Sequence, residues 1–267
     1  MSKHKPSWLL TPQNFLLGLG ILLVALLPSA AYAVGGPPNC ALATVAGNYA
    51  VATLGQQAGG YAAAVFLMTS DGNGNLSGSG TESLNGTVFS NVTVAGTYTA
   101  NHSCWFTAAT ADSLDNISNF SGAIGQNGYE LVGFSTDAGT QVQFTAYRLH
   151  ATQCTLASVA KKFGAQVKSP LTPDGSSSAT QQWYILKKGS GTGFWVANVN
   201  GTVAQGTASA TYSVNSNCTY TSTVTNSDGT TGHFFGIGGI TLNGVGWVSM
   251  ATDSGWVSLA TGYFRSQ

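Results

Sequence analysis

Twice the chain reads Cys-x-Leu-Ala-x-Val-Ala, first as Cys40-Ala-Leu-Ala-Thr-Val-Ala46 and again as Cys154-Thr-Leu-Ala-Ser-Val-Ala160. Each of these stretches is followed, 64 positions after its first cysteine, by a second cysteine, Cys104 or Cys218, and the two frames are offset by 114. A motif that recurs together with its spacing indicates that one domain has been duplicated. We therefore predict two equivalent domains with the same fold.

The N-terminal segment has the composition of an export signal. Lys3 and Lys5 form a basic start, residues 15–27 are an apolar run, and Ala31-Tyr-Ala33 is the small-x-small pattern at which signal peptidase cuts. The run is shorter than the roughly 20 residues that a membrane-spanning helix needs. We expect residues 1–33 to be a signal peptide cleaved after Ala33, and the mature protein to be periplasmic or extracellular without stable membrane insertion. An uncleaved N-terminal anchor is the alternative.

The four cysteines are an even number, as expected for disulfides in an oxidising compartment. Three connectivities exist, and the shared spacing of 64 favours Cys40–Cys104 and Cys154–Cys218, because each repeat then closes its own bridge. The chain has no Cys-x-x-Cys motif of the kind that typically holds zinc. We predict no metal site and no cofactor.

Charge excludes one class of partner. Only 7% of the residues are charged, and 43% are apolar. Without Lys3 and Lys5 the mature chain has 7 basic and 9 acidic residues. Such a surface does not attract nucleic acid or acidic lipid headgroups, so we expect no nucleic-acid partner. The sequence leaves the oligomeric state open.

Each repeat divides into short runs rich in Val, Thr, Tyr and Phe that are separated by Gly, Asn and Asp turns. In the first repeat we expect strands over residues 47–54, 61–70, 75–84, 93–100, 103–110, 118–124, 128–135 and 140–148. Eight strands joined by tight turns predict an all-β fold of two antiparallel up-and-down barrels, 34–150 and 151–267, with β-sandwiches as the alternative. Because residues 149–154 leave almost no linker, we expect the two domains to be in contact.

The last strand of each repeat ends on an arginine after a mostly apolar row. By strand alternation we expect two inward rows: Val142, Phe144, Ala146 and Arg148 in the first repeat, and Val257, Leu259, Thr261, Tyr263 and Arg265 in the second. The first strands have Gly47-Asn48-Tyr49 and Lys161-Lys162-Phe163 at matching places.

This pattern resembles the calycin barrels, the relatives of lipocalin and avidin, in which an arginine packs over a Gly-x-Trp motif of the first strand. It is also similar to the barrels of allene oxide cyclase and dirigent proteins, and to secreted bacterial proteins with Asp-Gly-x-Gly and Gly-x-Tyr repeats. The resemblance implies that Arg148 packs over Tyr49 and Arg265 over Phe163. It further implies a barrel that binds a small hydrophobic ligand or, as a minor alternative, an isomerase or cyclase.

Tryptophan is distributed unequally between the repeats. The first repeat has Trp105 alone, whereas the second has Trp183, Trp195, Trp247 and Trp256. Large aromatic residues fill a core or line a ligand cavity. We name these four tryptophans, together with Arg148 and Arg265 at a barrel mouth, as candidate ligand-binding residues; the alternative role of the arginines is a cation stacked on an aromatic ring.

Catalytic motifs are scarce. No histidine lies in a recognisable nucleophile or metal motif. Glu82 and Glu130 fall in expected strands, where a barrel lumen raises a carboxyl pKa, but Glu130 more often faces outward in such a pattern. Asp71-Gly-Asn-Gly-Asn75 partly fits a calcium loop, and a β-hairpin turn is the simpler interpretation. We expect no catalytic residues and no enzyme.

The sequence therefore predicts a secreted, non-enzymatic protein that binds a small apolar ligand in a calycin-like barrel. The second hypothesis is a structural or surface-interaction module of the cell envelope or matrix, with exposed apolar patches. The third is an isomerase or cyclase that uses Glu130 with Arg148.

Overall fold

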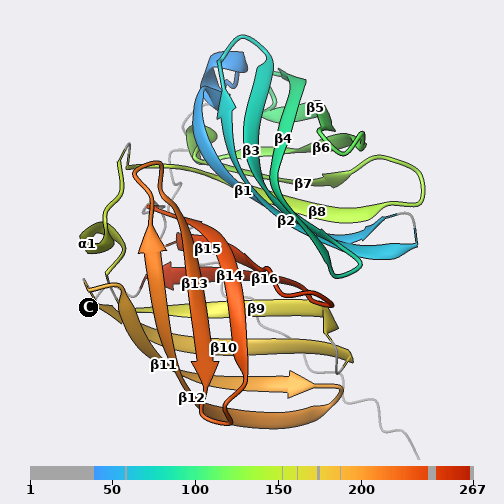
Figure 1. Ribbon diagram of the computed structural model, residues 1–267. Coiled ribbons are helices and arrows are strands. Elements are labelled where there is room, and N and C mark those ends of the chain that lie inside the picture. Colours follow the sequence, from blue (N-terminus) through green and yellow to red (C-terminus); the bar gives the residue numbers. More distant parts are fainter. Residues whose placement is uncertain are drawn as a thin grey trace, which may run out of the picture. The chain divides into compact units, whose positions relative to one another are not determined.

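The computed structural model describes residues 39–57, 59–151, 153–160, 162–172, 175–186, 188–239 and 245–264. The expected signal peptide and Arg265 lie outside these residues. The chain forms two closed barrels of eight antiparallel strands each, joined in chain order (Figure 1). The all-β prediction and the choice of barrels over sandwiches are both confirmed.

The first barrel is preceded by the short 3-10 helix η1 (Leu42–Val45), and a second 3-10 turn, η2 (Gln126–Gly128), connects its sixth and seventh strands. Its strands are β1 (Gly47–Gln57), β2 (Gly60–Ser70), β3 (Asn75–Leu84), β4 (Thr87–Ala100), β5 (Trp105–Asp112), β6 (Ile117–Gly125), β7 (Glu130–Ser135) and β8 (Gln141–Arg148). Strand β8 pairs with β1 and closes the sheet.

The second barrel is preceded by one helical turn, α1 (Leu156–Val159). Its strands are β9 (Lys162–Thr172), β10 (Gly175–Leu186), β11 (Ser190–Val199), β12 (Thr202–Val214), β13 (Thr219–Asn226), β14 (Thr231–Gly238), β15 (Val245–Ala251) and β16 (Val257–Phe264). Strand β16 pairs with β9. Among the described residues, no helix has both the length and the apolar character needed to cross a membrane.

Asp71 shows how the hairpin turns are built. Its Oδ1 accepts the backbone N–H groups of Asn73 at 2.7 Å and Asn75 at 3.0 Å, and its Oδ2 accepts the Asn75 side-chain amide at 2.6 Å. These hydrogen bonds, the side-chain one from Asn75 foremost, lower the pKa of Asp71. The carboxylate therefore belongs to a β-hairpin turn, the simpler interpretation of this segment.

Both predicted disulfides are present, Cys40–Cys104 and Cys154–Cys218. Each ties the segment before the first strand to the turn between the fourth and fifth strands. The helical turn beside the first bridge is held by the Tyr98 hydroxyl, which donates to the Leu42 carbonyl at 2.9 Å. The Tyr212 hydroxyl donates to the Leu186 carbonyl at 2.6 Å and lies 3.4 Å from the Leu156 carbonyl of the second helical turn. Each segment before a first strand is thus fastened covalently to its barrel, and in the first barrel Val45 of η1 also lines the lumen cavity.

Aromatic rings fill the first barrel. Phe144 meets Phe106 and Phe120 edge to face, with ring centroids 5.5 Å and 5.2 Å apart, a preferred geometry for packed rings. Leu131 and Ala146 complete this core cluster. The predicted inward row of β8 is confirmed, since Val142, Phe144 and Ala146 are all buried.

The predicted inward row of β16 is wrong. Ser258 and Ala260 face the lumen, so Val257 and Leu259 face outward, and the pairing with β9 shifts register between those two residues. The apolar character of Leu259 reflects packing against a cluster shared with the first barrel.

Strand register identifies the residues that match in the two repeats. Arg148 pairs with Tyr49 across β8 and β1, and the residue that pairs with Phe163 across β16 and β9 is Phe264. Arg265 is thus one position beyond the equivalent of Arg148, and its side chain falls outside the described residues.

The two barrels belong to one compact unit, Pro37–Gln267, and contact each other within it. The contact contains an apolar cluster whose members are at most 1% exposed outside the cysteines. Its buried members are Ala50, Ala52 and Val65 of the first barrel and Cys154, Cys218, Ile237, Val248 and Met250 of the second. At its edge, Ser83 Oγ donates to the Trp256 carbonyl at 2.8 Å. The short connection between the repeats predicted this contact.

Candidate functional site

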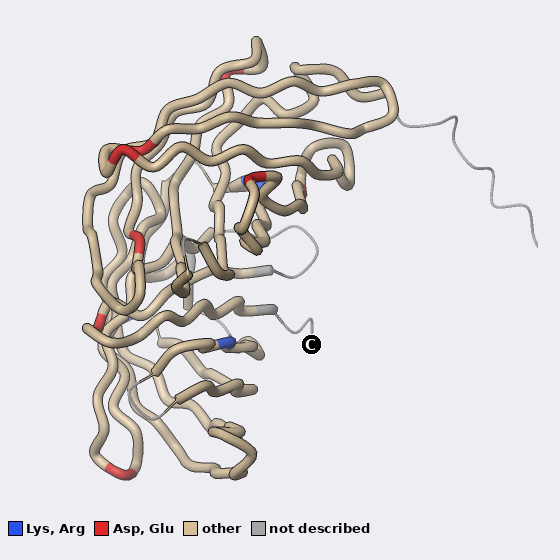
Figure 2. Tube along the Cα trace, turned by 90° about the vertical axis from the view of Figure 1, so that its right-hand side faces the viewer, with Lys and Arg blue, Asp and Glu red and all other residues tan. Residues whose placement is uncertain are grey.

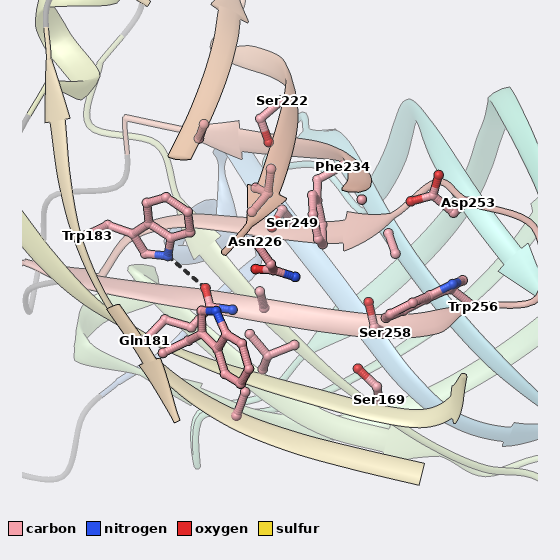
Figure 3. Close-up of a pocket in the computed structure, with 18 of the residues that line it drawn as sticks. Ser169, Gln181, Trp183, Ser222, Asn226, Phe234, Ser249, Asp253, Trp256 and Ser258 are labelled. Atoms are coloured by element: carbon pink, nitrogen blue, oxygen red, sulfur yellow. Dashed lines mark hydrogen bonds between the residues drawn. The ribbon is translucent and has the colours of Figure 1, made fainter. Parts of the chain in front are cut away.

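The lumen of the second barrel contains a cavity of about 290 Å³. All four tryptophans that the sequence singled out line it: Trp183, Trp195, Trp247 and Trp256. In Figure 3, Trp183 lies at one end of the cavity and Trp256 near the other, with polar side chains between them. The cavity is at the lower limit of the about 300 to 1,000 Å³ that is typical of small-molecule sites.

Three of the tryptophans stand opposite a glycine on the neighbouring strand. The pairs are Trp183 with Gly193, Trp195 with Gly206 and Trp247 with Gly262. In each pair the indole occupies the space that a side chain at the glycine position would need. A Cβ atom would be 2.7 Å from Trp183 Cδ2 at Gly193, 2.9 Å from Trp195 Cζ2 at Gly206 and 2.1 Å from Trp247 Nε1 at Gly262.

The glycines explain why a barrel with so many tryptophans is hollow. An indole that lies over a glycine rests against the sheet instead of projecting across the lumen. Eight-stranded barrels are narrow enough for side chains to fill them completely. The second barrel is therefore lined by its tryptophans, whereas the first is filled by its phenylalanines and retains a cavity of about 140 Å³.

The indole N–H groups differ in their partners. Trp183 Nε1 donates to Gln181 Oε1 at 2.7 Å (Figure 3). Trp195 Nε1 and Trp247 Nε1 are buried and have no hydrogen-bond partner among the described residues. A buried polar group without a partner costs about 1–3 kcal/mol. The described part of the chain therefore leaves two donors in the lumen wall without a partner.

Small polar side chains also line the lumen, among many apolar ones. Ser222, Ser249, Ser258 and Asn226 lie between the tryptophans (Figure 3). The hydroxyl of Tyr220 hydrogen-bonds Ser249, and burial raises the pKa of Tyr220 far above its ordinary value, so the phenol stays neutral. The lumen therefore offers hydroxyl and amide groups, and these four side chains and Tyr220 carry no charge.

Asp253 is the one formally charged residue among those that line this cavity. Its two carboxylate oxygens accept the backbone N–H of His233 at 2.6 Å and the His233 ring Nδ1 at 2.8 Å. Figure 2 shows how sparse Lys, Arg, Asp and Glu are along the described chain. A site without a free cation does not suit an anionic ligand.

The cavity reaches solvent at the β13–β14 turn. Thr230 and Thr231 are the exposed members of its lining, and both belong to this turn or its start. The opposite end of the barrel carries α1 and the Cys154–Cys218 bridge. A ligand would therefore enter between the hairpin turns, beside Trp256 and Asp253.

Of the two candidate arginines, Arg265 lies outside the described residues and Arg148 does not line this cavity. Arg148 belongs to the first barrel, where its Nη2 donates to the carbonyls of Thr44, at 2.9 Å, and Ala46. Its guanidinium lies 5.6 Å from the ring centre of Tyr49 and 5.2 Å from that of Tyr129. Arg148 thus stacks on aromatic rings and closes its barrel, the alternative role stated for it.

Of the two candidate glutamates, Glu82 is the one inside a lumen. It lines the cavity of the first barrel, is 8% exposed, and has an Oε2 with no hydrogen-bond partner among the described residues. Burial, assisted by the nearby charge of Asp112, raises the pKa of Glu82 to about 7. Glu130 lies on the outward row of β7 with Val132 and Phe134.

Comparison with known proteins adds no family to this geometry: neither a family model nor a curated protein matches the chain. The site is therefore interpreted from its own chemistry. The two disulfides are typical of extracellular or periplasmic proteins.

Proposed function

We propose that the second barrel binds a small, flat, uncharged and largely apolar molecule in its lumen. The observation that carries this proposal is the cavity of about 290 Å³ lined by four tryptophans, three of them lying over glycines. A chain that needed these tryptophans only as core would gain more stability from filling the space, because voids in a protein interior forfeit packing energy. Keeping the lumen open has a cost that a ligand offsets.

The chemistry of the wall specifies the ligand further. Indole faces favour flat rings, which stack on them or meet them edge to face. The unpartnered N–H groups of Trp195 and Trp247 favour a ligand with hydrogen-bond acceptors such as carbonyl or ether oxygens. The serine hydroxyls add weaker polar contacts. A carrier or scavenger role outside the cell, without catalysis, fits this site best.

Native mass spectrometry of the protein exported to an oxidising compartment tests the proposal, with masses compared before and after organic extraction. We expect a discrete extractable adduct, and after extraction we expect binding of the uncharged aromatic probe N-phenyl-1-naphthylamine. A matched pair of variants locates the site. Ala197→Trp fills the lumen of the second barrel, and Ala108→Trp changes an alanine that lines the cavity of the first.

The adduct and the probe are expected to be lost in Ala197→Trp and retained in Ala108→Trp. A bare mass together with no probe binding would count against a carrier. Equal binding by both variants would place the ligand elsewhere and would overturn the assignment to the second barrel.

A second role, as a surface-interaction module, is favoured by a separate observation. Trp105, Val132 and Phe134 of the first barrel are 46%, 39% and 53% exposed, and large exposed apolar patches mark interaction sites. This role concerns another barrel and is compatible with ligand binding. No observation favours an isomerase, since Glu130 and Arg148 are both absent from the residues that line the two lumen cavities.

A further inference from the structure

The outer face of strands β5 to β7 carries an exposed apolar patch, formed by Trp105, Val132 and Phe134. Trp105 Nε1 donates to Ser121 Oγ at 2.8 Å, and Ser121 is only 9% exposed although it lies on the outside of the barrel. The indole is therefore held against the sheet, where it covers the serine. A tryptophan fixed in this way presents its surface without losing side-chain entropy on binding.

The same face of the second barrel is buried. Phe134 pairs with Ser121 and Val132 with Ala123 across β7 and β6. In the second repeat the corresponding pairs are Met250 with Phe235 and Val248 with Ile237, across β15 and β14. Of these outward residues Ile237, Val248 and Met250 are all 0% exposed.

What covers this face in the second barrel is the outer side of β1 and β2, with Ala50, Ala52 and Val65 packed in one cluster with Ile237, Val248 and Met250. Duplication has thus given each repeat the same apolar face. The face of the second barrel packs against the first barrel within the chain, and the face of the first barrel is bare. A face that already serves as a barrel–barrel interface needs little change to serve as one again.

In a head-to-tail arrangement, the bare face of one copy would contact the second barrel of the next copy on the strands equivalent to β1 and β2. Those strands are β9 and β10, and their outer surface is polar. Register places Gly164 and Gln166 of β9 where β1 has Ala50 and Ala52. Across the pairing, β10 has Thr180 and Gln182 opposite them, where β2 has apolar residues. The outer surface of β9 and β10 in a second copy therefore offers the bare face no equivalent of the Ala50, Ala52 and Val65 contact, whereas the same face of a second copy offers exposed aromatic and aliphatic side chains.

We propose that two copies of this protein associate through the faces that carry Trp105, Val132 and Phe134, related by a two-fold axis. Isologous contact is the commonest way in which identical chains pair, because one patch satisfies both partners. The patch has the composition of an interface, with aromatic residues at its centre and Thr107, Gln143 and Thr145 on the adjoining strands as a polar rim.

Sedimentation velocity of the exported protein tests the proposal over micromolar to millimolar concentration. We expect a monomer–dimer equilibrium that Phe134→Ser weakens at least tenfold. The isosteric change Val132→Thr leaves the shape of the side chain unchanged, and we expect it to weaken the dimer as well. Phe194→Ser is the control, because Phe194 is 45% exposed on the second barrel and lies outside the patch.

A wild-type protein that stays monomeric at every concentration would overturn the proposal. This includes the case in which the patch binds a different protein instead of a second copy. An open series of oligomers would indicate head-to-tail contact and would also overturn it. So would a dimer that Phe134→Ser leaves intact, or one that Phe194→Ser weakens equally. Because these side chains are solvent-exposed, circular dichroism is expected to show unchanged β structure in each variant.

Discussion

Glu82 places its carboxyl group in the lumen of the first barrel, where water cannot solvate a charge. The unfolded chain ionises this group near its ordinary pKa of 4.5, whereas the folded protein holds it protonated up to about 7. The folded state therefore binds the proton more tightly. The difference corresponds to about 3 kcal/mol of folding free energy, as an order of magnitude.

We predict that the free energy of unfolding falls as pH rises from about 4.5 to about 7. Above about 7, Glu82 adds no further change to the free energy of unfolding. Glu82→Gln removes the ionisation, so the variant is expected to be more stable than the wild type at pH 8 and nearly equal to it at pH 4.5. Urea unfolding at a series of pH values measures this difference. A variant whose pH profile parallels that of the wild type would contradict the assignment.

The acids of the turns affect a different pH range. Hydrogen bonds lower the pKa of Asp71, Asp137 and Asp228 below the ordinary 3.8. Stability from such groups is present above that value and is lost as the pH falls through the lowered pKa. These aspartates therefore make the free energy of unfolding rise with pH, whereas Glu82 makes it fall, and they do so at a lower pH. Asp71→Asn is for this reason a suitable control for Glu82→Gln.

At the scale of the strand pair, Gly206 determines how Trp195 lies. Its backbone φ is not in the left-handed region, and the atoms nearest to an added Cβ all belong to the side chains of Ser227 and Trp195. We predict that Gly206→Ala folds, displaces the indole into the lumen and weakens binding of the aromatic probe about tenfold, equivalent to about 1.4 kcal/mol. Isothermal titration calorimetry measures the change.

Gly164→Ala is the matched control for this variant. The nearest atom to a Cβ at Gly164 is the Gln181 carbonyl oxygen at 3.8 Å, an ordinary contact. We expect unchanged probe binding and a gain in stability of up to about 1 kcal/mol, because alanine loses less backbone entropy than glycine. Equal losses of affinity in the two variants would show that the tryptophan–glycine contact does not set the shape of the lumen.

The segments that precede the two barrels depend on their disulfides. Each bridge joins cysteines 64 positions apart, and a loop of that length restricts the unfolded chain by about 4 kcal/mol in the chain-entropy model. We predict that replacing both Cys154 and Cys218 by Ala lowers the free energy of unfolding by about that amount. Urea unfolding of this double variant, beside the Cys40 and Cys104 equivalent, measures it; a loss below about 1 kcal/mol would contradict the prediction.

Most strands could be predicted from the sequence because turns and alternation are local properties. The expected strand 75–84 agrees with β3 at both ends. Strand β4 was expected from residue 93 and begins at Thr87, because Asn85 and Gly86, both with positive φ, make a tighter turn than was recognised. The face of β16 was misassigned because an apolar row facing another barrel has the same pattern as one that faces a lumen.

The candidate site was partly predictable for a similar reason. The excess of tryptophan in the second repeat indicated the barrel, since it is a property of composition. The glycines opposite those tryptophans are far from them in sequence, so only strand register shows that they pair. Trp105 was noticed as a lone tryptophan, but its exposure depends on which barrel face is covered, and alternation along one strand does not determine that.

For the whole molecule, the contact between the barrels predicts coupled unfolding. Val65 lies on the outside of β2 and is 0% exposed because it belongs to the cluster shared by both barrels. An unpaired buried charge there is strongly destabilising. We predict one calorimetric unfolding transition for the wild type and two for Val65→Asp, as the barrels separate. A single unshifted transition in the variant would show that the contact contributes nothing to stability.

The unequal placement of tryptophan gives the protein an intrinsic optical readout of both of its surfaces. Trp105 is half exposed on the first barrel, and Trp183, Trp195, Trp247 and Trp256 all look into the lumen of the second. Fluorescence from Trp105 would emit at longer wavelength and be quenched by iodide, whereas the lumen indoles would respond to whatever enters between them. The native chain would thus report the proposed ligand uptake and the proposed pairing in separate parts of one emission spectrum, without any attached dye.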